Sequence, residues 1–235
     1  MTDTFIILVK CLAAILAGVL AGNGAVYCFN KMPAKWLCDY GEQPSAELLD
    51  PYTQRVKSYP WKYIFTMLFV VLNIKMVMDD WQFAVAALCA IWLLLEMAIA
   101  DLKYRIVPDQ LVILLAVSAL GFLPFHSGWQ DCLFGGLAGF GVMGFTALLG
   151  RLAYRRETLG GGDIKLFASL GLVMGLVGIM AVFVLTTLLS AGHLIWLLIR
   201  KKLKRSDTVP MVPYIALSAA VYLVFLWGFE MSWNL

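Results

Sequence analysis

Long, unbroken apolar runs are the feature that most constrains this chain. A helix needs about 20 consecutive apolar residues to cross the hydrocarbon core of a bilayer, and runs of this kind fill most of the sequence. A membrane β-barrel would instead show alternating segments of about ten residues. Charged residues make up 14% of the 235 residues and the mean hydropathy is +0.84, whereas soluble domains are about a quarter charged. The sequence therefore predicts an all-α, polytopic integral membrane bundle of about eight transmembrane helices.

The expected spans follow the apolar runs. The boundary between the sixth and the seventh rests on a glycine-rich turn near "MGLVG". We expect a single membrane domain over residues 1–235, with a short cytoplasmic loop region at 30–60 that is too small to hold a core of its own. The spans are predicted at residues 4–28, 61–78, 82–100, 109–125, 131–150, 164–177, 178–199 and 211–231.

Lysine and arginine predict the orientation, because cytoplasmic loops carry an excess of both. With the N-terminus outside, all but Lys10 and Lys75 of the 18 basic residues fall in or beside inner segments. The predicted outer loops carry Asp79, Asp80 and Asp131 instead. The inner group comprises Lys31, Lys35, Arg55, Lys57, Lys62, Lys103, Arg105, Arg151, Arg155, Arg156, Lys165, Arg200, Lys201, Lys202, Lys204 and Arg205.

Two aspartates fall at the same predicted depth. Asp101 ends the third span in "EMAIADLKYRIVPDQL", and Asp163 begins the sixth in "LGGGDIKL". Both are at cytoplasmic helix ends, and acids in or near a bilayer are candidates for function. Two carboxyls about 3 Å apart cannot both ionise. The ionised one can accept a proton from water while the other donates to a carbonyl oxygen, so the pair is suited to hydrolysis by general acid–base catalysis.

The three glycines before Asp163 support this interpretation. Gly160, Gly161 and Gly162 would let a substrate backbone approach closely and would tolerate positive φ before the helix. The alternative is that the glycines form a turn and Asp163 is an ordinary capping acid, since aspartate is a preferred N-cap.

The neighbouring candidates also have ordinary structural interpretations. Lys165 could contact Asp163 or an acidic substrate group, or extend its amine to the membrane surface. Glu96 could support the aspartate pair, form an ion pair with Lys75 or Lys62, or line a polar cavity. Pro108 followed by Asp109 is typical of a helix start.

Other chemistries find little support. His126 lies in a predicted outer loop and His193 within the seventh span, without metal-ligand spacing, so no metal site is expected. No serine has an evident base, which disfavours a serine protease. No nucleic-acid partner is expected.

At these residues the chain resembles the type IV prepilin peptidases, which are GxGD-type membrane aspartic proteases. The central matches are "DLKYRIVPDQL" and "LGGGDIKLFASLG". Weaker matches are "GNGAVYCFNKMP", at the exit of the first span, and "VPMVPYIALSAAVYL", at the last span. Presenilin-type proteases share the second motif but lack the proline–aspartate sequence found here at Pro108–Asp109.

The resemblance implies that Asp101 and Asp163 are the catalytic pair, with Gly160, Gly161, Gly162, Lys165, Glu96, Pro108 and Asp109 as supporting or substrate-binding residues. It implies hydrolysis of the leader of type IV prepilins or pseudopilins, after a glycine, at the cytoplasmic face of the bacterial inner membrane. The protein substrate's apolar helix would lie in the lipid bilayer between spans. The oligomeric state is left open.

Two cofactors of the family need separate treatment. Many members bind zinc through two CxxC pairs in the first cytoplasmic loop, but this loop has only Cys38, so zinc is not expected. Bifunctional members also N-methylate the new N-terminus with S-adenosylmethionine through the same loop, and its shortness leaves methylation open here. The alternative function is a small proton- or cation-coupled membrane transporter that uses the same acids as a relay, because transporters also place polar groups in broken spans.

Overall fold

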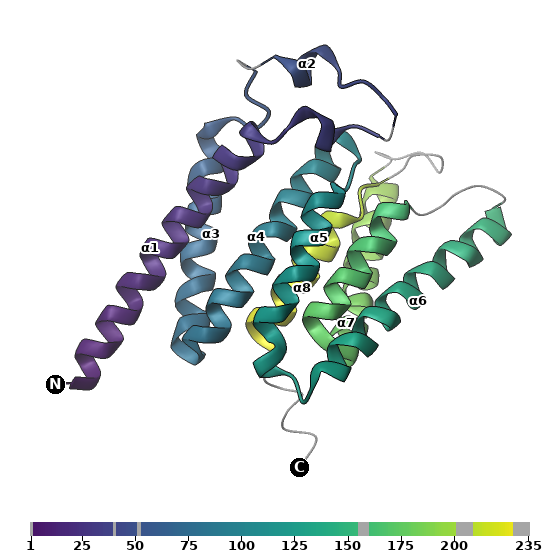
Figure 1. Cartoon of the computed structure of the whole chain (residues 1–235). Helices are drawn as coiled ribbons and strands as arrows, with labels where there is room; N and C mark the ends of the chain where they lie inside the picture. Colours follow the sequence, from purple (N-terminus) through teal and green to yellow (C-terminus); the bar gives the residue numbers. More distant parts are fainter. Residues whose placement is uncertain (1, 40, 51–52, 155–159, 201–208, 228–235) are drawn as a thin grey trace. The chain divides into compact units, whose positions relative to one another are not determined.

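The computed structural model describes residues 2–39, 41–50, 53–154, 160–200 and 209–227, and every element in these ranges is helical. The chain divides into two compact units, Met1–Glu96 and Met97–Leu235, with α4 continuing from the first into the second. Figure 1 shows the elements in chain order. They are α1 (Thr2–Lys31), η1 (Ala34–Leu37), α2 (Ala46–Leu49), α3 (Ser58–Asp79), α4 (Trp81–Tyr104), α5 (Asp109–Ser118), η2 (Ala119–Phe125), α6 (Trp129–Tyr154), α7 (Gly161–Ile199), α8 (Val212–Val221) and η3 (Tyr222–Leu226).

The helical membrane fold predicted from the apolar runs is confirmed. Among the described residues, five helices are long and apolar enough to cross a membrane: α1, α3, α4, α6 and α7. Two shorter apolar stretches, Asp109–Phe125 and Val212–Leu226, coincide with the predicted fourth and eighth spans as far as residue 227. The count of eight crossings remains a prediction, and so does the single-domain assignment.

In the first unit, small residues bring α1 and α3 into close contact. A Cβ atom at Gly18 would lie 2.6 Å from the Val70 Cα, and one at Gly22 would lie 2.3 Å from the Thr66 Cα. Small residues are favoured at such contacts because, in lipid, helices associate through close van der Waals packing. The buried Asn73 side chain adds a hydrogen bond to the Ala14 carbonyl, 2.9 Å away. The two helices therefore lie side by side along most of their length (Figure 1).

Side-chain hydrogen bonds hold the two ends of the segment between α1 and α3 together. The Asn30 amide donates to the Val56 carbonyl (2.9 Å) and accepts from the Val56 N–H (2.8 Å). The Arg55 guanidinium donates to the carbonyls of Met32 and Leu48. Since a buried backbone group needs a partner, these two side chains hold the ends of residues 32–57 together. This segment corresponds to the predicted loop at 30–60.

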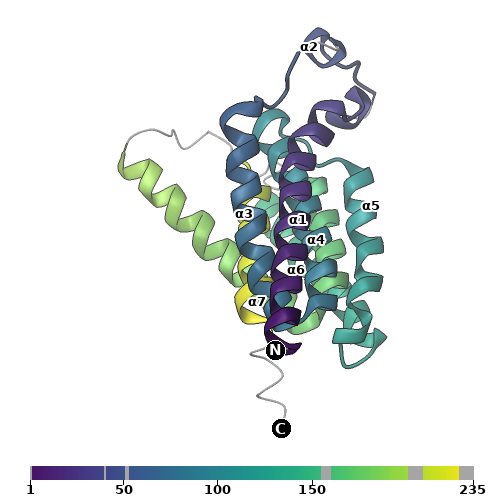
Figure 2. The same cartoon turned by 90° about the vertical axis from the view of Figure 1, so that its left-hand side faces the viewer.

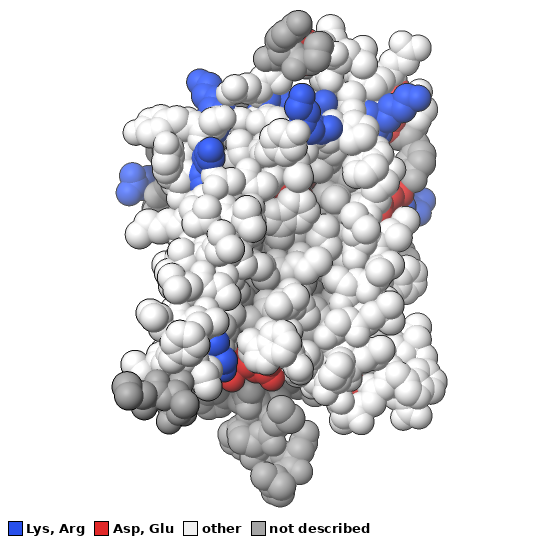
Figure 3. Space-filling model, turned by 60° about the vertical axis from the view of Figure 1, so that its left-hand side comes forward, with Lys and Arg blue, Asp and Glu red and all other residues white. Residues whose placement is uncertain are grey.

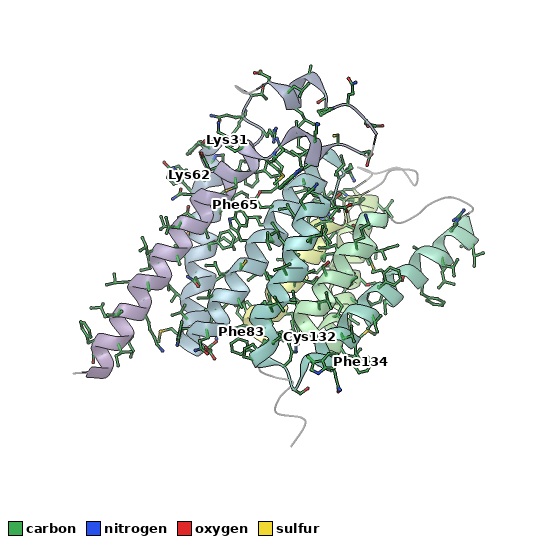
Figure 4. All side chains as sticks on the ribbon, in the orientation of Figure 1. Lys31, Lys62, Phe65, Phe83, Cys132 and Phe134 are labelled. Carbon is green, nitrogen blue, oxygen red and sulfur yellow. The ribbon has the colours of Figure 1, made fainter. Side chains whose placement is uncertain are left out.

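The two ends of the first unit carry different charges. Lys31, in the last turn of α1, and Lys62, near the start of α3, lie at one end of this pair of helices, and Phe83 lies at the opposite end (Figure 4). There Lys75 forms an ion pair with Asp79 at 2.5 Å. On this face a broad uncharged band separates the charged side chains at the two ends (Figure 3). The basic residues that also entered the orientation prediction at 155–156 and 201–205 lie outside the described residues.

In the second unit, α6 and the start of α7 pack through facing glycines. A Cβ at Gly135 would be 2.3 Å from the Gly171 carbonyl oxygen, and one at Gly139 would be 2.3 Å from the Phe167 carbonyl oxygen. The contacts run in opposite order along the two helices, so α6 and the first part of α7 are antiparallel. Because no side chain separates the backbones here, the position of the start of α7 is closely defined.

Helix α7 is broken at Gly175, which has φ 70° and ψ −178°. Beyond this residue the chain runs back towards the end from which α7 came. Gly178 lies against Tyr222, near the end of α8, and the His193 ring contacts Tyr214, near its start. Figure 2 shows the part after the break as a separate rod that ends at the gap before α8.

The glycine-rich boundary predicted at "MGLVG" is therefore correct, with the break at the first glycine of that sequence. The sequence pattern placed the division after residue 177, two residues too late. We call the two parts α7a (Gly161–Met174) and α7b (Leu176–Ile199).

Candidate active site

Asp101 lies in the last turn of α4 and is 7% exposed. The helix ends three residues later at Tyr104, and Arg105 follows with φ 60°, the left-handed conformation that commonly terminates helices. The Asp101 Oδ2 accepts a hydrogen bond of 3.0 Å from the Val212 N–H at the start of α8. The Met211 amide faces the same carboxylate. Asp101 is therefore held by the N-terminus of another helix, 111 residues away in sequence.

Asp163 is the third residue of α7, in its first turn. The N-cap is Gly160, whose carbonyl accepts the Asp163 N–H at 3.1 Å. The Gly160 amide faces the Asp163 carboxylate, as in the returning half of a capping box. The capping interpretation is thus partly right: Asp163 does face its own helix start, but from the third position of the helix and not from the cap.

Within the second unit, the Asp101 and Asp163 carboxylates are near enough to repel one another when both are ionised. Asp163 is at the N-terminus of α7 and Asp101 beside that of α8, and each helix presents the positive end of its dipole there. The Arg105 guanidinium, just after α4, also acts electrostatically on Asp101. That the two aspartates form a catalytic pair remains a prediction.

The three glycines differ in their surroundings. A Cβ at Gly162 would lie 2.9 Å from the Val107 Cβ, so this glycine lets the linker before α5 approach α7. Among the described residues outside its own turn, no atom lies within 4 Å of the position that a Cβ would take at Gly161. The space beside Gly161 is therefore open, next to the turn that carries Asp163.

Lys165 contacts a partner that the sequence did not predict. Its amine lies 3.0 Å from both Asp109 carboxylate oxygens, 56 residues away in the chain. Neither predicted role describes this pair, which joins the first turn of α5 to the first turn of α7. Pro108 is buried at the cap position and α5 begins at Asp109, as the sequence predicted.

Glu96 belongs to the first unit, where it is fully buried and neither carboxylate oxygen has a hydrogen-bond partner among the described residues. The predicted ion pair with Lys75 is wrong, because Lys75 pairs with Asp79. A Glu96 role in support of the aspartates remains a prediction.

The amides of Met211 and Val212 are the part of the site that sequence reasoning missed. Backbone donors have no residue type that reveals them. The signal available was "VPMVPYI", in which Pro213 marks a helix start. Within the described ranges, no group of three His, Cys, Asp or Glu side chains could hold a metal ion.

Residues 88–196 match the family model described as the type IV leader peptidase family. This segment contains both Asp101 and Asp163. The chain is similar to proteins named prepilin leader peptidase/N-methyltransferase. It is 30% identical over 172 residues to one from Aeromonas hydrophila (72% of this chain, 58% of the relative). It is 29% identical over 176 residues to one from Aeromonas salmonicida, with the same two coverages.

A third relative of that name, from Pseudomonas aeruginosa, is 30% identical over 156 residues, covering 65% of this chain and 52% of the relative. The chain thus spans little more than half the length of the curated relatives it matches. No solved structure matches the chain.

The second activity in these names implies S-adenosylmethionine as methyl donor. Ligand sites of this size are concave and enclose most of the ligand. The acids whose side chains are described between α1 and α3 are instead exposed, and Asp50 accepts a hydrogen bond from the Thr53 hydroxyl. The use of a methyl donor by this chain therefore remains a prediction. The exposed acids are Asp39, Glu42 and Asp50.

Proposed function

We propose that this chain, which matches the type IV leader peptidase family model over residues 88–196, is a membrane aspartic endopeptidase that removes the leader of type IV prepilins or pseudopilins. The observation that carries the proposal is the proximity of the Asp101 and Asp163 carboxylates beside the N-termini of α8 and α7. Two acids held close together are the groups that hydrolysis by general acid–base catalysis requires.

Each aspartate has a distinct part in the reaction. Burial disfavours the ionised form of Asp101, and the Val212 amide, the Arg105 guanidinium and the Met211 amide oppose this effect, so we assign to Asp101 the part of accepting a proton from water. The water oxygen bonds to the scissile carbonyl carbon while Asp163 gives its proton to the carbonyl oxygen. The tetrahedral diol then collapses and the C–N bond breaks. The proton on Asp101 passes to the leaving nitrogen, and a diol proton returns to Asp163.

The glycines provide the approach for the substrate. The open space beside Gly161 lets an extended peptide reach the carboxylates without meeting a side chain. Gly162 keeps the turn in place by packing on Val107. By the distribution of lysine and arginine, this end of the second unit faces the cytoplasm of a bacterial inner membrane, and the apolar helix of the prepilin lies in the bilayer.

The direct test uses the full chain in detergent with a synthetic prepilin. We expect the leader to be released by a single cut, and a prepilin with a bulky residue in place of the glycine before the cut to remain intact. If neither peptide is cleaved, whereas a named relative cleaves the first under the same conditions, the proposal fails. The mass of the new N-terminus, measured with S-adenosylmethionine present, reports methylation separately.

No observation favours the transporter alternative. Transporter sites lie near the bilayer midplane, whereas Asp101 lies in the last turn of α4 and Asp163 in the first turn of α7. The matched relatives are named as peptidases.

Disrupting the Asp109–Lys165 pair is expected to slow leader cleavage. Ion pairs exposed to this degree contribute about 0–1 kcal/mol, and Lys165 is 54% exposed. Lys165→Asp is therefore expected to slow leader cleavage by roughly fivefold, since 1 kcal/mol corresponds to about that ratio. The cause would be displacement of the first turn of α7. The double exchange Asp109→Lys with Lys165→Asp is expected to recover most of the rate. A double variant slower than either single variant would mean that the pair does not position the turn.

A further inference from the structure

A buried histidine and an aspartate meet at the break in α7. The His126 Nδ1 lies 2.9 Å from the Asp131 Oδ2, and its Nε2 lies 2.9 Å from the Val173 carbonyl oxygen. The Asp131 Oδ1 accepts the Leu176 N–H at 3.1 Å. The side chain of His126 is 4% exposed, and its ring meets Trp227 edge-on with centroids 5.2 Å apart. Figure 4 labels Cys132, the residue after Asp131.

These contacts determine which ring nitrogens carry hydrogen. A backbone carbonyl only accepts, so the Nε2 must donate to Val173. An ionised carboxylate also only accepts, so the Nδ1 must donate to Asp131. A ring that donates from both nitrogens is an imidazolium. With Asp131 ionised, this geometry is that of a charged pair, His126⁺ with Asp131⁻.

The backbone around the break favours the same charges. Val173 is in the last turn of α7a, where unpaired carbonyls form the negative end of the helix dipole. Leu176 begins α7b, whose free N–H groups form a positive end. The His126 cation therefore lies at the negative end of α7a, and the Asp131 anion lies at the positive end of α7b. One ion pair thus satisfies backbone groups on both sides of Gly175.

We propose that His126 and Asp131 form a proton-dependent clasp that fixes the reversal of α7 and thereby positions α7a. When the ring loses its proton, one of its two donated hydrogen bonds is lost and a nitrogen lone pair faces a carboxylate. The stability of the reversal therefore falls as the pH rises. The effect of the clasp on Asp163, at the opposite end of α7a, rests on the proposed function.

The other titratable groups at this corner are few among the described residues. From α6 the Cys132 thiol lies near Asp131. From η3 the Tyr222 hydroxyl lies near Gly178. Residues 173–178 of α7 contribute none. Histidine is the side chain whose ordinary charge change falls near neutral pH, and His126 is the histidine at this corner.

The variant Asp131→Asn tests the dependence on the proton while keeping the hydrogen bonds at the break in α7. The asparagine oxygen can still accept the Leu176 N–H, and its amide can donate to the Nδ1 of a neutral ring that still donates to Val173. We expect the thermal midpoint of the wild type in detergent to fall by about 3 °C between about pH 6 and about pH 8.5, from the loss of roughly 1 kcal/mol. The Asp131→Asn midpoint should change clearly less over the same range.

His193→Asn is the matched control, because it removes the other histidine of the chain. It is expected to keep the wild-type pH dependence. Equal pH dependence in Asp131→Asn and wild type, or its loss in His193→Asn, would overturn the clasp. These midpoints do not depend on peptidase activity. If cleavage occurs, the wild-type rate relative to Asp131→Asn should also fall as the pH rises, whereas a constant ratio would overturn the effect on Asp163 alone.

Discussion

Asp101→Asn and Asp163→Asn are each expected to abolish leader removal in a chain that still folds. The asparagine oxygen at position 101 can accept the Val212 N–H as the carboxylate does, so α8 keeps its contact. At position 163 the N-cap is the Gly160 backbone, which the substitution does not alter. Neither amide can exchange a proton with water or a carbonyl at neutral pH. We expect cleavage to fall by about 10³-fold or more in each single variant, measured on a co-expressed prepilin by immunoblot.

The control for this experiment is Asp79→Asn. It makes the same chemical change at an exposed carboxylate that pairs only with Lys75, one helical turn away. It should cleave at the wild-type rate, and all three variants should have similar thermal midpoints. Substantial leader removal by both the Asp101 and the Asp163 variants would contradict the proposal that these two aspartates are the catalytic pair.

Gly175→Ala is expected to destabilise the fold strongly at the reversal of α7. The values φ 70° and ψ −178° lie in a region that is essentially restricted to glycine, and a side chain there costs about 1–3 kcal/mol. The new Cβ would also lie 2.4 Å from the Asp131 Oδ2 and 2.9 Å from the His126 Cε1. Neither group can move away without breaking its own hydrogen bonds. We expect a midpoint lowered by roughly 5 °C or more, from a loss of at least about 2 kcal/mol, with a reduced yield of folded protein.

Gly144→Ala provides the comparison. No atom lies within 4 Å of the position of its Cβ, and it lies within α6. Alanine is favoured over glycine in a helix by about 1 kcal/mol, so this variant should unfold at or slightly above the wild-type temperature. If Gly175→Ala and Gly144→Ala unfold together, the reversal does not depend on the left-handed glycine.

Parts of the site that depend on helix ends were predictable from the sequence. Counting spans placed Asp101 and Asp163 at the same face of the membrane, and the structure has their carboxylates near enough to repel one another when both are ionised. The break in α7 was predictable within two residues, because two glycines close together in an apolar run weaken a helix. The start of α5 at Asp109 followed from the preceding proline.

Contacts between distant segments were not predictable in this way. The pairing of Lys165 with Asp109 depends on how α5 and α7 pack, and a single sequence contains no measure of that distance. Val212 contributes a backbone N–H, which any residue except proline would supply. His126 was assigned to an outer loop and considered only as a metal ligand. Its partners are a side chain five residues on and a carbonyl 47 residues away.

The double hydrogen bond between Asn30 and Val56 has a consequence for how such chains can diversify. The Asn30 side-chain amide joins the two ends of the intervening segment through one donated and one accepted hydrogen bond with the Val56 backbone. The ends of α1 and α3 are thus fixed relative to each other whatever lies between them. Since closing a longer loop costs only about 0.6 kcal/mol for each doubling of its length, this is a site where an insertion could be accepted without disturbing the helices on either side.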